Sequence, residues 1–206
     1  MAAKLFGTAI PCTLAFSYVE RYILPDMLPW LFTASPLLHG AVSRAMGIPA
    51  LITCFSLFWL TVHGFSVGSA RKTYMEKARK DGEKEVDTRY ALPHLYVEGN
   101  TKHSRAFNAV QRSHQQAFET LPQLLFFVLV ASAAFPLSAA AHMVLWLYGR
   151  IVWTHGYATS GGEAGKRYDH PLAFLIFASF LGLFFTALIA AVELTGLWAL
   201  PRFPFA

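Results

Sequence analysis

The sequence has few charged residues and only two cysteines, and both shortages restrict the kind of protein that it encodes. Asp, Glu, Lys and Arg make up 14% of the 206 residues, against about 25% in a typical soluble domain. Hydrophobic residues make up 55%, which excludes an ordinary soluble domain and indicates a multi-pass membrane protein. Cys12 and Cys54 lie in apolar surroundings outside any CxxC or metal-binding spacing. We therefore expect inert thiols and no metal site.

The sequence also lacks a nucleotide-binding loop, an internal repeat and a low-complexity tract. Its net charge is +5, and most of the basic residues lie in one loop, 71–105, which holds nine Lys or Arg and six Asp or Glu. Such a loop favours an anionic lipid surface and an anionic ligand over nucleic acid. The positive-inside rule places it on the cytoplasmic or equivalent side. Within it, the segment YALPHLY (90–96) is expected to be irregular.

Four apolar stretches predict four membrane-spanning helices packed as an antiparallel bundle. They cover residues 46–68, 104–136, 139–159 and 171–192. The second is longer than a bilayer is thick, so its first half should project beyond the membrane or line a polar cleft. Pro122 should kink it. We expect an all-α membrane protein with this bundle over residues 46–198.

The ends of the chain are expected to lie outside the bundle. Residues 5–19 are apolar but contain Pro11 and are too short to span a bilayer. Pro25, Pro29 and Pro36 divide the following segment into short pieces, and residues 24–38 suit a membrane interface or a partner's surface. Residues 1–45 are therefore predicted to be an interfacial or partner-docking extension. Two prolines should keep the tail 199–206 from being helical.

Polar residues recur on one face of the second helix. Arg112, Gln115 or Gln116, Glu119 and Gln123 follow one another at steps of three and four. On the third helix, Arg150, Trp153 and Tyr157 share a face in the same way. Charged side chains at membrane depth are costly and normally face a bundle interior or a cavity, so these two faces predict a site. His63, by contrast, is expected to be a packing or hydrogen-bonding residue.

Two interpretations of these charges remain open from the residues alone. One is an interhelical salt-bridge network, for instance Arg150 with Glu119. The other is a site for an anionic ligand with one cationic corner, to which the loops would add Arg71, Lys72, Lys166 and Arg167. Glutathione fits the second description, because Arg binds carboxylates in a bidentate manner, Glu119 suits an ammonium, and a cation beside the thiol favours the reactive thiolate.

Several blocks of sequence resemble one family. GSARKTY (68–74), FNAVQRSHQQAFETLP (107–122) and GRIVWTHGYATSGGEAGKR (149–167), together with the four-span layout, are similar to the MAPEG family, the membrane-associated proteins of eicosanoid and glutathione metabolism. The most similar branch is microsomal glutathione transferase type three, and the resemblance covers residues 46–196. It implies a homotrimer that holds glutathione between protomers near the cytosolic face.

The resemblance also implies roles for individual residues. Arg167 aligns with the arginine that activates the thiol, and Lys166 beside it is the alternative. Arg71 would act from the neighbouring protomer. The remaining glutathione-binding positions are Arg112, His114, Gln116, Glu119, Arg150, Trp153 and Tyr157. The chain departs from the family pattern at Gln116, where Asn is usual, and at Trp153, where Tyr is frequent, so these two positions bear on whether catalysis is retained.

The leading hypothesis is a membrane glutathione transferase and glutathione-dependent peroxidase, with glutathione as co-substrate and a lipophilic electrophile or lipid hydroperoxide from the bilayer. The alternative is a non-catalytic accessory subunit of a larger membrane complex that reuses this fold. A lipid-binding scaffold is a third possibility, disfavoured by Arg112, Glu119 and Arg167. The endoplasmic reticulum and the mitochondrion are both compatible locations.

Overall fold

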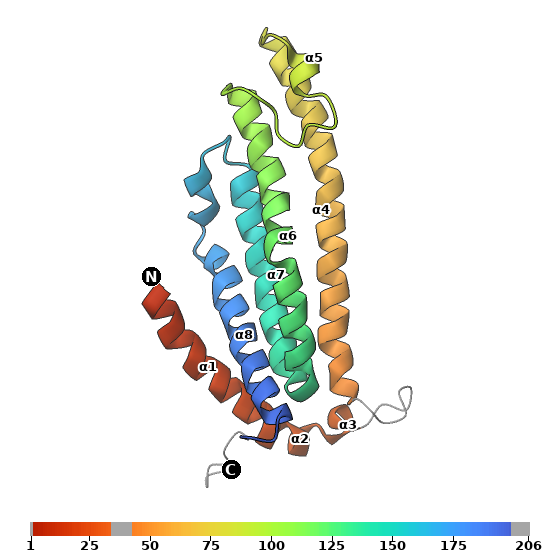
Figure 1. Ribbon diagram of the computed structural model, residues 1–206, viewed down its shortest axis with the longest axis vertical. Helices are drawn as coiled ribbons and strands as arrows, with labels where there is room; N and C mark the ends of the chain where they lie inside the picture. Colours follow the sequence, from red (N-terminus) through yellow and green to blue (C-terminus); the bar gives the residue numbers. More distant parts are fainter. Residues whose placement is uncertain (1, 34–42, 199–206) are drawn as a thin grey trace. The chain divides into compact units, whose positions relative to one another are not determined.

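The computed structural model describes residues 2–33 and 43–198, with the backbone alone for residues 2–6 and 8. Over these residues the chain consists of helices joined by turns, which confirms the all-α expectation (Figure 1). The long helices are α1 (Ala2–Tyr22), α4 (Gly47–Lys80), α6 (Lys102–Ala134), α7 (Pro136–Ala158) and α8 (Leu175–Leu194). The short ones are α2 (Leu24–Met27), α3 (Pro29–Phe32), α5 (Val86–Arg89), η2 (Arg44–Met46), η3 (Ala164–Tyr168) and η4 (Pro171–Phe174).

Three helical segments are long and apolar enough to cross a membrane, as a membrane protein requires. They are Arg44–Lys80, Lys102–Ala134 and Pro171–Leu194. Helix α7 is not among them, since His142 and Arg150 lie within its 23 residues and reduce its hydropathy. Membrane character is thus supported by three spans, and a fourth span remains a prediction.

The predicted helix bounds agree closely with α6, α7 and α8, but the end of α4 was predicted wrongly. Residues 71–80 were assigned to the charged loop, whereas α4 continues through them to Lys80. Ala70, Tyr74 and Ala78 recur every fourth residue and pack against a buried cluster, which gives this charged stretch an apolar face. Helix α6 continues through Pro122, which lies inside it.

The chain forms two compact units, each built from separate stretches of sequence. Unit 1 comprises Met1–Phe55, Leu121–Leu147 and Leu175–Ala206, and unit 2 comprises Ser56–Thr120 and Tyr148–Phe174. All the candidate site residues named above belong to unit 2 except Gln123, which belongs to unit 1.

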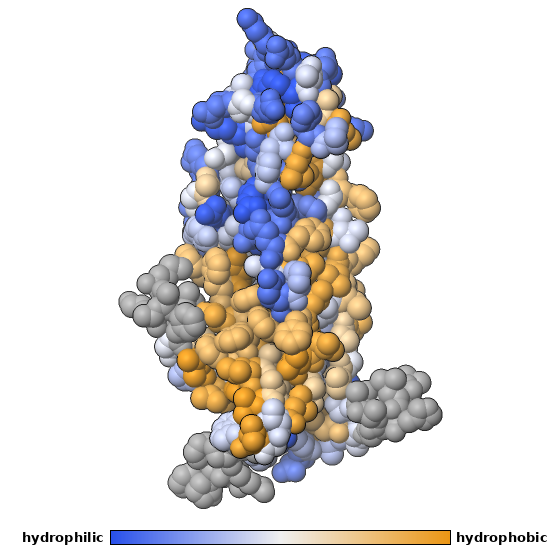
Figure 2. Space-filling model, viewed as in Figure 1, coloured by the Kyte–Doolittle hydropathy of each residue, from blue (hydrophilic) through white to orange (hydrophobic). Residues whose placement is uncertain are grey.

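In unit 1, α1 packs against α8 (Figure 1). Thr13, Ser17 and Glu20 are buried on one face of α1, whereas Leu14 and Phe16 are exposed. One helix runs from Ala2 to Tyr22 with Pro11 inside it, so the helix extends beyond the apolar stretch 5–19 at both ends. The visible surface of unit 1 is largely hydrophobic, coloured orange in Figure 2. A helix with its polar face inward and apolar residues outward suits apolar surroundings.

Two adjacent charges attach the end of α1 to the rest of unit 1. The Glu20 carboxylate accepts hydrogen bonds from the backbone N–H groups of Leu137, at 2.5 Å, and Ser138, at 2.6 Å. Both donors lie in the first turn of α7, where N–H groups have no partner within the helix. Arg21 forms an ion pair with Glu193 of α8, and its Cζ lies 5.0 Å from the centre of the Phe135 ring.

Two expectations about the chain ends extend beyond the described residues. Part of the predicted interfacial segment, residues 34–38, and the tail 199–206 lie outside them. The described part of the interfacial segment contains α2 and α3, and Trp30 is exposed there.

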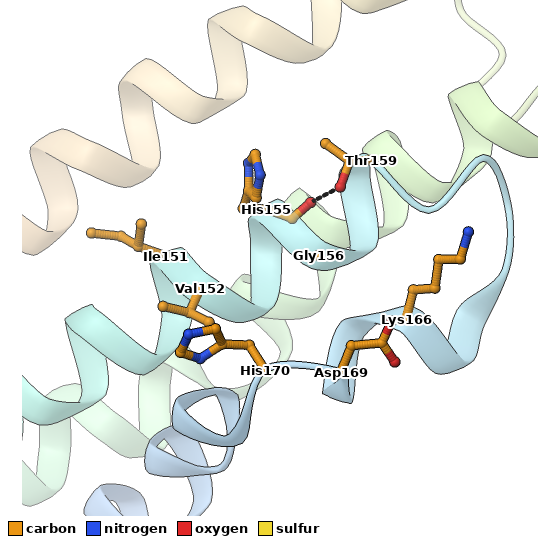
Figure 3. A pocket seen from close by; sticks show the side chains of 8 residues that line it. All are labelled: Ile151, Val152, His155, Gly156, Thr159, Lys166, Asp169 and His170. Carbon is orange, nitrogen blue, oxygen red and sulfur yellow. Dashed lines mark hydrogen bonds between the residues drawn. The ribbon is translucent and has the colours of Figure 1, made fainter.

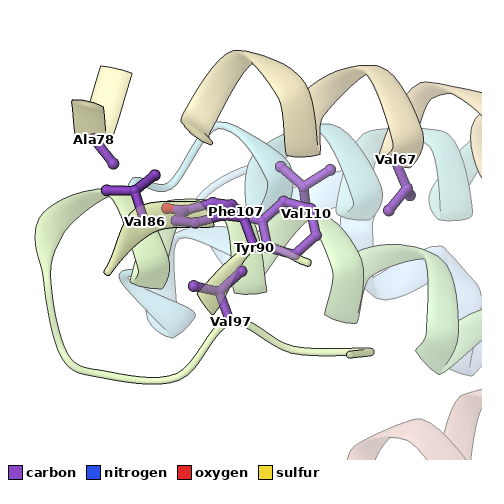
Figure 4. Packing of buried hydrophobic residues seen from close by; sticks show 7 residues of the cluster. All are labelled: Val67, Ala78, Val86, Tyr90, Val97, Phe107 and Val110. Atoms are coloured by element: carbon purple, nitrogen blue, oxygen red, sulfur yellow. The ribbon is translucent and has the colours of Figure 1, made fainter. Parts of the chain in front are cut away.

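Unit 2 contains a buried cluster that fixes the charged segment after α4 (Figure 4). The cluster consists of Val67, Ala78, Val86, Tyr90, Val97, Phe107 and Val110. Burial raises the pKa of the Tyr90 phenol to about 12. Residues 90–96 are irregular, as predicted, and they are anchored to this cluster at Tyr90.

Candidate functional site

A buried arginine connects α6 and α7 within unit 2. The Arg150 side chain on α7 is 2% exposed and donates to Gln116 Oε1 and, at 3.3 Å, to the Ser113 carbonyl oxygen, both on α6. Its Cζ lies 4.7 Å from the centre of the Trp153 ring, a cation–π distance. Arg150 Nε is buried without a hydrogen-bond partner among the described residues. The positive charge is therefore held by neutral groups and keeps one unused donor.

A second guanidinium approaches the same aromatic residues from the segment after α7. Arg167 lies on η3, with its Cζ 5.3 Å from the Tyr157 ring centre and 5.9 Å from that of Trp153. Arg167 Nε is also buried and without a partner in the part of the chain that the structure describes. Trp153 and Tyr157 pack edge to face at 5.2 Å. Two cations around shared aromatic rings favour an anion nearby.

Lys166 and Arg167 are neighbours in sequence but have different surroundings. Lys166 Nζ lies 3.3 Å from a Glu163 carboxylate oxygen, and its side chain is 47% exposed. Arg167, in contrast, contacts the aromatic rings described above. The loop approaches α7 at Gly156, where an added Cβ would lie 2.9 Å from the Lys166 carbonyl oxygen. A side chain at position 156 would therefore displace the segment that carries Arg167.

A polar pocket of about 450 Å³ opens beside this group. It is lined by Tyr96, Gly99, Asn100, Arg105, Asn108, Ala109, Arg112, Tyr157 and Gly162. Four of these residues, Arg105, Asn108, Ala109 and Arg112, share one face of α6. The polar face predicted from the sequence began at Arg112 and did not include Arg105 and Asn108. These two residues precede Arg112 by seven and four positions, a spacing that places them on the same helix face.

The glycine pair at 161–162 has a steric role at this pocket. Gly162 has a φ of +100°, and a Cβ there would lie 2.6 Å from Arg105 Cβ. Any side chain at this position would be strained and would collide with α6. Gly162 thus allows the loop after α7 to lie against the basic face of α6.

The other charges of α6 pair differently from the suggested salt-bridge network. Arg112 forms its ion pair with Glu119 on the same helix, with a second contact at 3.1 Å. Both side chains are partly exposed. The suggested pairing of Arg150 with Glu119 is wrong, because Arg150 donates to Gln116 and Ser113 instead. The amide at Gln116 is therefore engaged with the buried cation.

Arg71 and His114 have contacts of their own within unit 2. Arg71 donates to the carbonyl oxygens of Tyr90, His94 and Leu95 at 3.3, 2.6 and 3.0 Å, which holds the irregular segment in place. The His114 ring packs against the His63 ring, with 5.3 Å between their centres. The packing role expected of His63 is supported by its contact with Ser113 Oγ at 3.2 Å. In this chain Arg71 therefore orders a loop.

Metal binding would require several ligating side chains at one place. Among the residues that the structure describes, no group of three or more His, Cys, Asp or Glu side chains comes together. The site is instead defined by arginines, aromatic rings and amides, a set suited to a carboxylate-bearing organic ligand.

A family model described as the MAPEG family matches residues 49–192 of the chain.

Proposed function

Because this chain belongs to the MAPEG family, we propose that it is a membrane glutathione transferase that also reduces lipid hydroperoxides, of the microsomal type-three kind. The observation that carries the proposal is the polar pocket beside Arg105, Arg112 and Tyr157, close along α7 to the cluster of Arg150, Trp153 and Arg167. Residues 46–198 would form a four-span bundle, with α7 as the fourth span. Residues 1–45 and 199–206 would be its extension and tail.

Glutathione matches the chemistry of this region group by group. It carries two carboxylates, one ammonium and one thiol. Arg105 and Arg112 supply guanidinium donors for carboxylates, and Glu119 supplies a carboxylate for the ammonium. The pocket's volume of about 450 Å³ lies within the range of about 300–1,000 Å³ that is typical of small-molecule sites.

Arg167 is proposed to activate the thiol. A guanidinium beside the sulfur stabilises the thiolate and so increases the fraction of the nucleophilic form. Its buried, unpartnered Nε leaves a donor for that role. Arg150, held by Gln116 and stacked on Trp153, would keep the aromatic face in place and contribute positive charge.

The two reactions use the same thiolate. In transfer, the sulfur attacks an electrophilic carbon and a C–S bond forms; in a substitution the leaving group departs with its electron pair, and in an addition a proton from solvent completes the product. With a hydroperoxide, the sulfur attacks the terminal oxygen and the O–O bond breaks, which gives a sulfenic acid and an alkoxide that takes a proton from solvent to become the alcohol. A second glutathione then forms the disulfide and releases water. Two glutathione molecules thus supply the two electrons.

A subunit role in a larger membrane assembly is the second candidate. Helices α1–α3 lie outside the matched residues 49–192, and they expose apolar side chains such as Met27 and Trp30. Such residues would suit contact with a partner or with lipid. In this case the chain would be isolated together with other subunits and would not bind glutathione.

The test is turnover and binding by the gently solubilised protein. Arg167→Ala should reduce conjugation and peroxidase turnover by about 100-fold, the usual cost of removing a donor that stabilises developing negative charge, with a smaller loss of glutathione affinity. Lys84→Ala, an exposed cation elsewhere in unit 2, is the control for a change of charge. Unchanged turnover in Arg167→Ala would refute the assignment, and a larger loss in Lys166→Ala would transfer the role to Lys166.

A further inference from the structure

A second pocket in unit 2 is not used by the proposed reaction. It has a volume of about 420 Å³ and lies between α7 and the segment 166–170 (Figure 3). Its lining residues are Ile151, Val152, His155, Gly156, Thr159, Lys166, Asp169 and His170. We call it the amphipathic pocket, because apolar and charged side chains line different parts of it. It shares no lining residue with the polar pocket.

The wall that α7 provides changes from apolar to polar along the helix. Tyr148, Ile151, His155 and Thr159 follow one another at steps of three and four, so they share a face. Ile151 and Val152 form the apolar part of the pocket wall, and the exposed Tyr148 continues this face beyond the pocket, whereas His155 and Thr159 form the polar end. An exposed face of this kind suits a molecule with a polar head and an apolar chain.

The opposite wall carries both signs of charge. Lys166 and Asp169 line the pocket together with His170, and Figure 3 shows the His170 ring directed toward Val152. The backbone N–H of Leu172 donates to His170 Nδ1 at 3.2 Å. In a neutral imidazole the proton then lies on Nε2, which becomes a donor. The pocket thus offers a neutral donor, a carboxylate and the Lys166 cation, which also pairs with Glu163 at 3.3 Å.

The sequence position of this wall places it at the edge of a membrane span. Lys166, Asp169 and His170 immediately precede the apolar segment Pro171–Leu194, which is long enough to cross a bilayer. Charged residues that flank a span lie at the level of the lipid headgroups. The ligand of the amphipathic pocket is therefore to be sought among the lipids of the bilayer.

We propose that the amphipathic pocket binds one phospholipid with a zwitterionic headgroup. The phosphate interacts with Lys166 and His170, the ammonium interacts with the Asp169 carboxylate, and an acyl chain extends along Ile151 and Val152. The carboxylate disfavours a lipid that is only anionic, and Lys166 disfavours one that is only cationic. Of the residues on which this site relies, only Lys166, the alternative to Arg167, has also been considered for glutathione.

The experiment measures which lipid the protein retains. The purified full-length protein is exchanged into micelles containing equal amounts of dioleoyl phosphatidylcholine and dioleoyl phosphatidylglycerol, and bound lipid is counted by native mass spectrometry. Wild type should retain mainly phosphatidylcholine. Asp169→Asn should shift the ratio about threefold toward phosphatidylglycerol, the size expected for one partly exposed ion pair. Lys166→Gln should weaken retention of both lipids.

The matched control is Asp87→Asn, which removes an exposed carboxylate elsewhere in unit 2. It should leave the lipid ratio as in wild type. The proposal would be overturned if Asp169→Asn and Asp87→Asn retained phosphatidylglycerol and phosphatidylcholine in the same ratio. It would also be overturned if the wild-type protein retained no lipid or preferred phosphatidylglycerol. Glutathione binding is measured on the same samples. If the wild-type protein prefers phosphatidylcholine but does not bind glutathione, the proposed enzymatic function is refuted and the proposed lipid site is not.

Discussion

The contact between Arg150 and Gln116 allows a quantitative test of how the buried cation is held. Gln116→Leu removes the side-chain acceptor and leaves the Arg150 charge buried, for which about 3 kcal/mol of destabilisation is expected. Arg150→Met removes the charge and leaves the Gln116 amide oxygen unpaired, at an expected cost of about 1 kcal/mol. The Ser113 carbonyl oxygen keeps its bond to the N–H four residues further along α6.

The double variant distinguishes a coupled pair from two separate residues. Additive effects would give about 4 kcal/mol, but once the charge is absent the Gln116→Leu substitution no longer leaves it unpaired, and an apolar pair of similar volume is tolerated. We therefore expect about 1 kcal/mol for the double variant, which is a coupling of about 3 kcal/mol between the two sites.

The measurement is the unfolding free energy of the four proteins in mixed micelles with increasing dodecyl sulfate, followed by circular dichroism. A coupling below about 0.5 kcal/mol is within the range of independent sites and would refute the argument. Glutathione binding by the double variant adds a second readout. If Arg150 contacts glutathione as proposed, the double variant folds but binds more weakly than Gln116→Leu alone.

Two further predictions concern the stability of each unit. Glu20→Ala removes the acceptor of two N–H groups at the start of α7, so it should destabilise the protein by about 1–3 kcal/mol, measured by unfolding as above; an effect no larger than that of the exposed Asp26→Ala would contradict this. The His103 ring, 2.7 Å from Asp81, lowers the pKa of the Asp81 carboxyl below 3.8 mainly through this hydrogen bond. The stabilisation that the ionised Asp81 carboxylate gives the folded protein is therefore present above about pH 4. It is lost as the pH falls through the lowered pKa of Asp81 in the folded state. Asp81→Asn should reduce the loss of unfolding free energy at acid pH, whereas Asp87→Asn should not. If the two variants showed the same dependence of unfolding free energy on pH, the proposed role of the His103–Asp81 contact would be refuted.

Much of the helix layout is readable from the sequence, because apolar runs bounded by charges or prolines determine where α6, α7 and α8 begin and end. The error at α4 has a physical reason. A helix that leaves the membrane needs only a narrow apolar face, here Ala70, Tyr74 and Ala78, and charges on its other faces conceal that pattern. The length of α1 was underestimated because only its apolar residues 5–19 were counted, whereas the helix continues through Glu20 and Arg21 to Tyr22.

The candidate site was less predictable than the helices. Spacing placed Arg112, Glu119 and Arg150 on helix faces, but it cannot decide which charge pairs with which. That choice depends on side-chain reach across helices, and the structure pairs Arg112 with Glu119 along α6 while Arg150 contacts Gln116. The preference for Arg167 over Lys166 rests likewise on how the loop lies against α7 at Gly156.

The attachment of α1 has a consequence for how the chain is made. Glu20 and Arg21 are synthesised early, but their partners follow 117 to 172 residues later. During synthesis Glu20 and Arg21 lack the partner groups that they have in the folded protein until α7 and α8 emerge. At a few residues added each second, this interval lasts many seconds. Helix α1 therefore has to remain at the membrane surface or with the insertion machinery until then, and it is among the last of the helices to pack.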